Sequence, residues 1–141
     1  MKISDIMSKS VVSVSMDATL KVVKDIFDHA SFHHILVVES SKLCGVISDR
    51  DLLKAISPNI GTASETTKDI ATLNKKAHQI LTRKLITLLP DATIYDAITL
   101  FNQHNISCIP VVNESGKPVG VLSWRDIFKA IEQNKNHKTT T

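Results

Sequence analysis

The fold is decided by a stretch that occurs twice, GVISDRDLLKAI at residues 45–56 and GVLSWRDIFKAI at residues 120–131. In both copies a glycine and an apolar pair precede a serine, an arginine and an aspartate. A run with helical periodicity follows each aspartate. When a chain contains the same pattern twice, an internal repeat is the first interpretation to test.

The repeat extends well beyond this stretch. DATLKVVKDIFDHASFHHILVVES, which begins at residue 17, aligns with DATIYDAITLFNQHNISCIPVVNES, which begins at residue 91. The offset is therefore 74, and one added residue near Gly116 raises it to 75 for the two stretches quoted first. Most of the chain is consequently one unit written twice.

Each copy predicts the element order β-α-β-β-α. VVSV at 11–14 and LITL at 85–88 are short apolar runs typical of strands. ILVV and IPVV predict the second strands, and LCGVI and PVGVL predict the third, after turns at ESSK and ESGK. Apolar residues at helical spacing predict the first helix of each copy, namely Leu20, Val23 and Phe27, and Ile94, Ala97, Ile98 and Phe101. The residues expected to cap these helices are Asp17, Thr19, Asp91 and Thr93.

These elements predict an α/β fold with repeat one at 1–57 and repeat two at 78–133. Residues 58–77 are expected to form a linker with a short helix, and residues 134–141 a disordered tail. Pro58 and Gly61 break the linker, while Ile70 and Leu73 are its expected core contacts. Because neither half has enough apolar surface to close alone, we expect their two three-stranded sheets to pack together.

Composition excludes several classes of protein. The 141 residues are enough to bury roughly 68–70% of the unfolded surface without disulfides or a structural metal. A formal charge of +3, with interspersed signs, disfavours a nucleic-acid binder. The sequence contains no apolar run long enough for a membrane span and no signal-peptide pattern at its start. Cys44 and Cys108 form no CxxC motif, so we expect reduced thiols and a cytoplasmic protein.

The paired units, with DIM at 5–7, DATL at 17–20, IPVV and GVISDRDLLKAI, resemble tandem CBS domains, the Bateman module. The resemblance covers almost the whole chain. The linker, without a fused domain, is similar to stand-alone bacterial CBS proteins of the acetoin-utilisation type. The resemblance implies two β-α-β-β-α repeats packed through three-stranded sheets with pseudo-two-fold symmetry. It also implies a homodimer that binds AMP, ADP, ATP or S-adenosylmethionine between its repeats and signals to an unknown partner protein.

The Ser-x-x-Asp pattern at the start of the last helix has two interpretations. Ser48 and Asp51 have the spacing of a helix capping box, as do Ser123 and Asp126. The same carboxylate can accept hydrogen bonds from two ribose hydroxyls, while the helix start and the intervening arginine attract a phosphate. Spacing alone favours the cap because the motif is short. Duplication within a CBS-like pattern favours ribose binding.

The resemblance places adenine against the first strand and the approach to the second strand of one repeat, facing the helix start of the other. Leu36 replaces Pro110 in copy one, and Trp124 replaces Asp49 in copy two, so the second cleft is narrowed, silent or selective for another ligand. The first cleft is expected to contain Val46, Ser48, Arg50, Asp51, Ile86, Thr87, Ile106, Ser107, Cys108 and Pro110. The second is expected to contain Val12, Ser13, Phe32, His33, His34, Val121, Ser123, Arg125 and Asp126.

No other pattern indicates catalysis. Paired carboxylates with metal spacing, an activated nucleophile and a phosphate-binding glycine loop are all missing from the sequence, so we expect no enzyme, no required cofactor and no metal site. Gly45 and Gly120 are expected to allow close backbone approach within a strand. Trp124 is expected either to anchor an interface or to cover the core. The alternative function is a ligand-free scaffold for dimerisation or protein docking.

Overall fold

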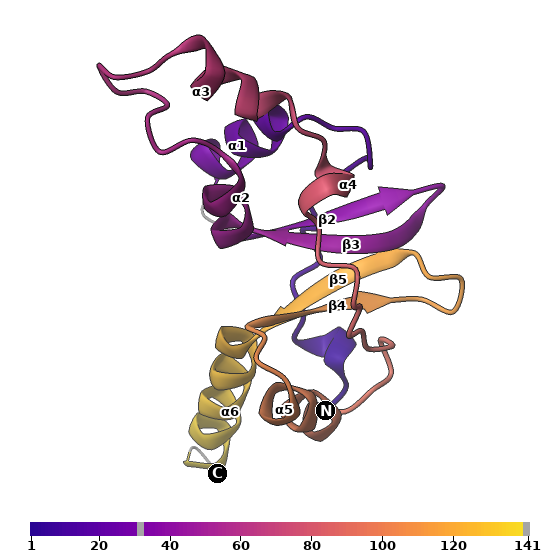
Figure 1. Ribbon diagram of the computed structural model, residues 1–141. Coiled ribbons are helices and arrows are strands. Elements are labelled where there is room, and N and C mark those ends of the chain that lie inside the picture. Colours follow the sequence, from indigo (N-terminus) through magenta and orange to yellow (C-terminus); the bar gives the residue numbers. More distant parts are fainter. Residues whose placement is uncertain (31–32, 140–141) are drawn as a thin grey trace. The chain divides into compact units, whose positions relative to one another are not determined.

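The chain folds as two compact units, and the computed structural model describes residues 1–30 and 33–139 of it. We call Val12–Leu85 the repeat-one unit, and Met1–Val11 with Ile86–Thr141 the repeat-two unit. In chain order the elements are η1 (Ile3–Asp5), β1 (Ser13–Val14), α1 (Leu20–His29), β2 (His34–Glu39), β3 (Lys42–Ser48), α2 (Asp49–Ala55), α3 (Thr67–Ala71), η2 (Thr72–Asn74), α4 (Ala77–Ile80), α5 (Ile94–Gln103), β4 (Cys108–Val112), β5 (Pro118–Ser123) and α6 (Trp124–Thr139) (Figure 1).

The repeat-one unit contains a three-stranded sheet with the order β1-β2-β3. β1 is parallel to β2, and β2 is antiparallel to β3, with His34 opposite Ser48 at one end of the hairpin. Alternate residues of β2 point to the same face of the sheet. On that face the core contains Val14, Leu20, Val23, Ile35, Val37, Ile47 and Leu52 from the strands and from α1 and α2.

The first helix of each repeat begins at the predicted threonine. The Thr19 side chain accepts a hydrogen bond from the Val22 amide, and the Thr93 side chain accepts one from the Asp96 amide. Asp96 also accepts from the Thr93 amide, which completes a capping box. Leu20, Val23 and Ala97 are buried, and the other predicted apolar positions are partly buried against the same cores, which fixes α1 and α5 against their sheets.

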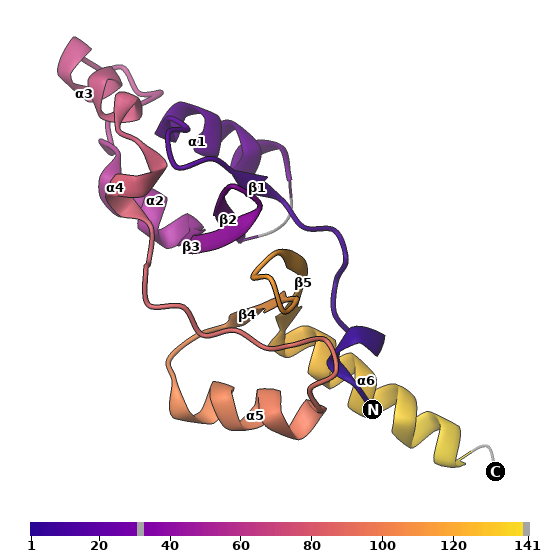
Figure 2. The same cartoon turned by 90° about the vertical axis from the view of Figure 1, so that its right-hand side faces the viewer.

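The repeat-two unit contains the antiparallel pair β4-β5, with α5 and α6 on one side of that hairpin in both views (Figures 1 and 2). The strand predicted at 85–88 is reduced to a single parallel bridge between Leu88 and Val111. The reason lies in the strand opposite. In repeat one the Leu36 amide donates to the Val12 carbonyl, whereas Pro110, at the equivalent position, has no N–H to donate. The element order is otherwise β-α-β-β-α in both units, as predicted.

Two segments far from the hairpins in sequence complete the units. Thr82 pairs with Val46 on β3, and Ser8 pairs with Val121 on β5. A Cβ atom on Gly45 would lie 2.7 Å from the Thr82 carbonyl oxygen, and one on Gly120 would lie 2.9 Å from the Ser8 carbonyl oxygen. Both glycines therefore allow close backbone approach, as predicted. Because residues 1–11 join the repeat-two unit, the compact units divide the chain at different places from the sequence repeats.

The linker and the C-terminal segment differ from expectation in detail. The predicted linker helix is divided into α3 and η2, a further short helix α4 begins at the end of the linker, and Ile70 is exposed rather than packed in a core. Ser57 holds the linker by donating to the Asp69 carboxylate at 2.6 Å, and the Thr72 hydroxyl accepts from the Ser57 amide at 3.0 Å. α6 continues to Thr139, so its helical backbone extends through most of the segment expected to be a disordered tail.

Candidate functional site

The last helix of the repeat-one unit begins with a complete capping box. β3 leads directly into α2, and Ser48 is the N-cap residue. The Asp51 amide donates to Ser48 Oγ at 3.1 Å, and the Ser48 amide donates to Asp51 Oδ2 at 2.9 Å. The cap predicted from the spacing is therefore confirmed. Both residues are half-buried, and the reciprocal hydrogen bonds hold the carboxylate at the helix start.

The repeat-two unit reproduces this geometry at the start of α6. The Ser123 amide donates to Asp126 Oδ2 at 2.9 Å, and the Asp126 amide donates to Ser123 Oγ at 3.3 Å. The Ser123 hydroxyl also donates to Asp126 Oδ2 at 3.1 Å. The duplicated sequence pattern is thus a duplicated three-dimensional arrangement.

Capping leaves each carboxylate with further acceptor capacity. The caps use Oδ2 of Asp51 and Oδ2 of Asp126. An ionised carboxylate offers two oxygens with about four acceptor sites in total. A cap and hydrogen bonds from ribose hydroxyls are therefore chemically compatible. The neighbouring Arg50 and Arg125 are exposed to solvent, where a guanidinium can form a bidentate contact with a phosphate.

In the repeat-one unit, the approach to β2 contacts the start of α2. His33 Nδ1 lies 2.9 Å from Asp49 Oδ2, and the Asp49 amide donates to the His33 carbonyl at 3.0 Å. His34 faces Ser48 across the hairpin. Burial lowers the pKa of His34, and the charge of His33 lowers it further, while Asp49 and Asp51 act in the opposite direction.

The adenine slot is the group of residues on the first strand and the approach to the second strand against which the resemblance places the base. Its other copy-one residues lie along the three-stranded sheet. Val12 accepts a hydrogen bond from the Leu36 amide at 3.0 Å, and Ser13 pairs with Leu36. Phe32, also predicted here, lies outside the described residues. Val46, which is predicted in the first cleft with Ser48 and Asp51, pairs with Leu36 from the other side, in β3. The slot residues described in copy one therefore belong to the same sheet as the Ser48 cap.

In the repeat-two unit one of the predicted slot residues, Cys108, likewise lies beside the start of the last helix. Cys108 is opposite Ser123, and Pro110 is opposite Val121. Burial raises the pKa of Cys108 to about 12, so its thiol stays protonated at neutral pH. Ile86, Thr87 and Ile106 are half-buried and Ser107 is exposed, in the segments that lead into Leu88 and β4.

The structure thus groups the predicted residues by repeat. In each unit, strand pairing places the first residue of the hairpin opposite the serine of that unit's own Ser-x-x-Asp cap, His34 opposite Ser48 and Cys108 opposite Ser123. The two predicted clefts combine residues of both units, and they stay predictions. Sequence reasoning missed the contact between Asp49 and His33. The signal was the hairpin itself, because pairing His34 with Ser48 brings their neighbours together at its end.

Neither a metal site nor a membrane span is found among residues 1–30 and 33–139. In that part of the chain no three His, Cys, Asp or Glu side chains are grouped to hold a metal ion. α1 ends at His29, whose Nδ1 contacts the Asp25 carbonyl oxygen at 2.7 Å. His33 therefore lies outside α1, and the two histidines are not presented by one helix as paired metal ligands would be. No helix in the same residues has both the length and the apolar character required to cross a bilayer.

Comparison with known sequences identifies both repeats. The CBS domain family model matches residues 3–58 and 77–133. The uncharacterized protein MJ1232 of Methanocaldococcus jannaschii is 28% identical over 130 residues, which cover 92% of this chain and 39% of that protein. The homoserine O-acetyltransferase of Methanosalsum zhilinae is 31% identical over 98% of this chain and 25% of its own length. The chain spans less than half the length of the first curated relatives it matches.

Solved structures share the fold across nearly the whole chain. An acetoin utilization protein, AcuB, from Vibrio cholerae has a TM-score of 0.80 at 20% identity, and the match covers 100% of this chain and 97% of that one. The CBS domain pair of protein MJ0100, in complex with 5′-methylthioadenosine and S-adenosyl-L-methionine, has a TM-score of 0.75 at 24% identity, covering 95% and 98%. CBSX2 in complex with AMP has a TM-score of 0.78 at 22% identity, covering 95% and 98%. At these identities the likeness shows the fold.

Proposed function

Because the chain belongs to the CBS domain family through both of its repeats, we propose that it is a regulatory module that binds an adenosyl compound. The ligand class is AMP, ADP, ATP or S-adenosylmethionine. Two solved structures of the same fold contain ligands of this class, AMP in one and S-adenosyl-L-methionine with 5′-methylthioadenosine in the other.

The observation that carries the proposal is the duplicated arrangement at the starts of α2 and α6. In each repeat a half-buried carboxylate is fixed by its own capping box beside an exposed arginine. We assign ribose to Asp51 and Asp126, because a carboxylate accepts from two neighbouring hydroxyls. We assign any phosphate to Arg50 and Arg125, with the helix-start amides as additional donors.

The base requires a flat apolar slot with backbone polar groups at one edge. In the first cleft we propose that adenine lies against residues of repeat two while Asp51 holds the ribose from repeat one. The second cleft reverses these roles, with Asp126 on the ribose and copy one supplying the slot. The proposed slot residues are Ile86, Thr87, Ile106, Ser107, Cys108 and Pro110 in the first cleft, and Val12, Ser13, Phe32, His33 and His34 in the second.

Regulation follows if the ligand has different affinities for two arrangements of the protein. We propose that the chain acts as a cytoplasmic homodimer without catalytic activity, and that a partner protein responds to the ligand-dependent change. The acetyltransferase relatives are matched over only 25% of one such enzyme, so the activity in their name is not transferred to this chain.

A ligand-free scaffold is the second candidate, and the caps themselves favour it. Asp51 and Asp126 already accept hydrogen bonds from their own N-cap amides, so the helix starts are satisfied without a ligand. In that case dimerisation or docking of another protein would be the function, and nucleotides would have no effect on stability.

Thermal unfolding in the presence of separate ligands distinguishes the two candidates. AMP, ATP and S-adenosylmethionine are each added to the purified protein, and NADH serves as a larger adenine-containing comparison. A ligand at about 100 times its Kd stabilises the folded chain by roughly 2.7 kcal/mol. We expect a rise of several degrees in Tm with at least one adenosyl compound. If none of them changes the Tm at millimolar concentration, the sensor is rejected and the scaffold is retained.

A further inference from the structure

The two Ser-x-x-Asp caps differ in charge at their second position. Asp49 follows Ser48 in repeat one, whereas Trp124 follows Ser123 in repeat two. The start of α2 therefore carries two carboxylates and one guanidinium, and the start of α6 carries one of each. This difference lies within one helical turn of the aspartates to which ribose is assigned.

Asp49 is held at the start of α2 by two contacts. Its Oδ1 accepts from the Arg50 amide at 2.8 Å, and its Oδ2 lies 2.9 Å from Nδ1 of His33 on the approach to β2. The side chain of Asp49 is still 48% exposed. Among the described residues no lysine or arginine forms an ion pair with it. A carboxylate fixed in this place acts on any charged group that approaches the cap.

The charge of Asp49 also acts on the strand beside the cap. His34 lies opposite Ser48 at the end of the β2–β3 hairpin. Burial is the main cause of the lowered pKa of His34, and Asp49 opposes this effect more strongly than Asp51 does, while His33 lowers the pKa further. Of the two carboxylates in the first turn of α2, Asp49 therefore has the larger effect on a residue of the predicted adenine slot.

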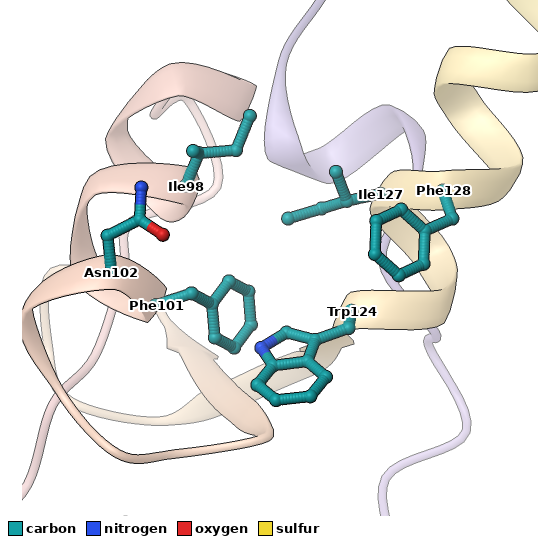
Figure 3. A pocket seen from close by; sticks show the side chains of 6 residues that line it. All are labelled: Ile98, Phe101, Asn102, Trp124, Ile127 and Phe128. Carbon is teal, nitrogen blue, oxygen red and sulfur yellow. The ribbon is translucent and has the colours of Figure 1, made fainter.

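Trp124 has a different role at the aligned position of repeat two. Figure 3 shows its ring beside the ring of Phe101 on α5, and the two ring centres are 6.1 Å apart at an angle of 77°. This edge-to-face contact lies in an apolar groove of about 290 Å³ between α5 and α6. The groove is lined by Ile98, Phe101, Asn102, Trp124, Ile127 and Phe128. The second position of this cap thus packs against a helix and adds no charge to the start of α6.

We propose that Asp49 makes the repeat-one cap selective for adenosyl compounds without a phosphate, such as 5′-methylthioadenosine and S-adenosylmethionine, and against AMP and ATP. This selectivity rests on the proposed function, in which Asp51 holds the ribose, and it names the ligand class of that cap. The repeat-two cap, where Arg125 has no second carboxylate beside it, accepts phosphorylated ligands.

Electrostatics gives the direction and the size of this preference. AMP and ATP are anions at neutral pH, because the second ionisation of a phosphate monoester has a pKa of about 6. A like charge about 4 Å away weakens binding about fivefold in bulk water, and more where water is excluded. Asp49 thereby offsets the attraction that Arg50 offers to a phosphate. The same carboxylate attracts a sulfonium or ammonium group.

Proteins with a single intact cap carboxylate test the selectivity. Asp126→Asn leaves Asp51 intact, and Asp51→Asn leaves Asp126 intact. Isothermal titration at pH 8 and about 0.1 M salt measures the Kd of each full-length protein for 5′-methylthioadenosine, AMP and ATP. We expect the Asp126→Asn protein to bind 5′-methylthioadenosine at least about fivefold more tightly than ATP, and the Asp51→Asn protein to show the opposite order.

Asp49→Asn, added to the Asp126→Asn protein, removes the charge and keeps a side chain that can contact His33. The Kd for ATP, divided by the Kd for 5′-methylthioadenosine, should fall at least about fivefold. A general loss of structure changes both Kd values and leaves their ratio unchanged. Glu39→Gln is the matched control, because it removes a carboxylate at the opposite end of the hairpin, about 17 Å away along β2. That distance exceeds the screening length of about 10 Å, so the ratio should not change.

The outcomes separate this selectivity from the proposed function. A ratio that Asp49→Asn leaves unchanged, or that Glu39→Gln changes equally, overturns the selectivity while ligand binding stands. The same holds if the Asp126→Asn protein binds ATP more tightly than 5′-methylthioadenosine. Wild-type binding that Asp126→Asn abolishes for every compound shows that the repeat-one cap takes no ligand, which also overturns the selectivity. A wild type that binds none of the compounds overturns the proposed function itself.

Discussion

Replacement of Gly45 by alanine tests the backbone contact between β3 and the segment at Thr82, which is distant from it in sequence. The new Cβ would contact the Leu81 side chain and would lie 2.7 Å from the Thr82 carbonyl oxygen. That oxygen accepts from the Val46 amide at 3.2 Å, and the Thr82 amide donates to the Val46 carbonyl at 2.9 Å. The methyl group therefore forces the Thr82 backbone away from β3.

The cost follows from these distances. Overpacking typically costs about 1–3 kcal/mol, and a weakened backbone hydrogen bond adds roughly 1 kcal/mol. Alanine also reduces the conformational entropy of the unfolded chain, which stabilises the folded protein by about 0.4–1 kcal/mol and offsets part of this cost. We expect Gly45→Ala to lower the free energy of unfolding by about 1–3 kcal/mol. Gly120→Ala should cost less, because its Cβ would meet the flexible Met7 side chain and a carbonyl oxygen at 2.9 Å.

Urea unfolding followed by far-UV circular dichroism measures both variants, and Lys42→Ala, at an exposed position of β3, is the control. The urea concentration at half-unfolding should be highest for the control, lower for Gly120→Ala and lowest for Gly45→Ala, with an unchanged m value. A Gly45→Ala protein within about 0.5 kcal/mol of wild type would show that Thr82 does not pack on β3 as described. An inverted order of the two glycine variants would refute the distance argument.

Two further predictions concern titratable groups. The pKa of His34 is below its ordinary value of 6.5 in the folded chain. As the pH falls, His34 is therefore protonated in the unfolded chain before it is protonated in the folded chain. The free energy of unfolding should therefore be fully retained above pH 6.5 and should decline as the pH falls below it, and His34→Gln should flatten this slope in urea titrations between pH 5 and 7.5. Because burial raises the pKa of Cys108 to about 12, its alkylation by iodoacetamide at pH 8 should be roughly 1000-fold slower than that of a peptide cysteine. Rapid labelling of Cys108 in peptide mass spectrometry would contradict its burial.

Much of the fold could be predicted from the sequence because the patterns that indicate it are local and occur in both repeats. Apolar periodicity located α1 and α5, and the Ser-x-x-Asp spacing located both capping boxes. The close approach at Gly45 and Gly120 was also correctly predicted, although the atoms that approach were not. The CBS resemblance is confirmed over both repeats.

The rest depended on contacts between distant segments. No local pattern in residues 1–11 indicates that they pair with β5, since the contact is made by backbone groups alone: the Ser8 amide donates to the Val121 carbonyl, and the Val121 amide donates to the Ser8 carbonyl. To predict that the strand at 85–88 is shortened, one must know that Pro110 is the residue opposite Ile86, as Leu36 is opposite Val12 in repeat one. Only that pairing makes the missing N–H of Pro110 matter. The contact between His33 and Asp49 likewise followed from the hairpin register and not from either residue alone.

The central claim is that the duplicated aspartates bind ribose as well as capping their helices. Isothermal titration of wild type, Asp51→Asn and Asp126→Asn with AMP, ATP and S-adenosylmethionine tests it most directly. Asparagine still offers an oxygen to the N-cap amide, so the Tm should stay within a few degrees. Loss of charge-assisted hydrogen bonds should weaken binding at least about 10-fold in Asp51→Asn. Unchanged affinity in both variants, or no binding by the wild type to any of the three compounds, would contradict the account.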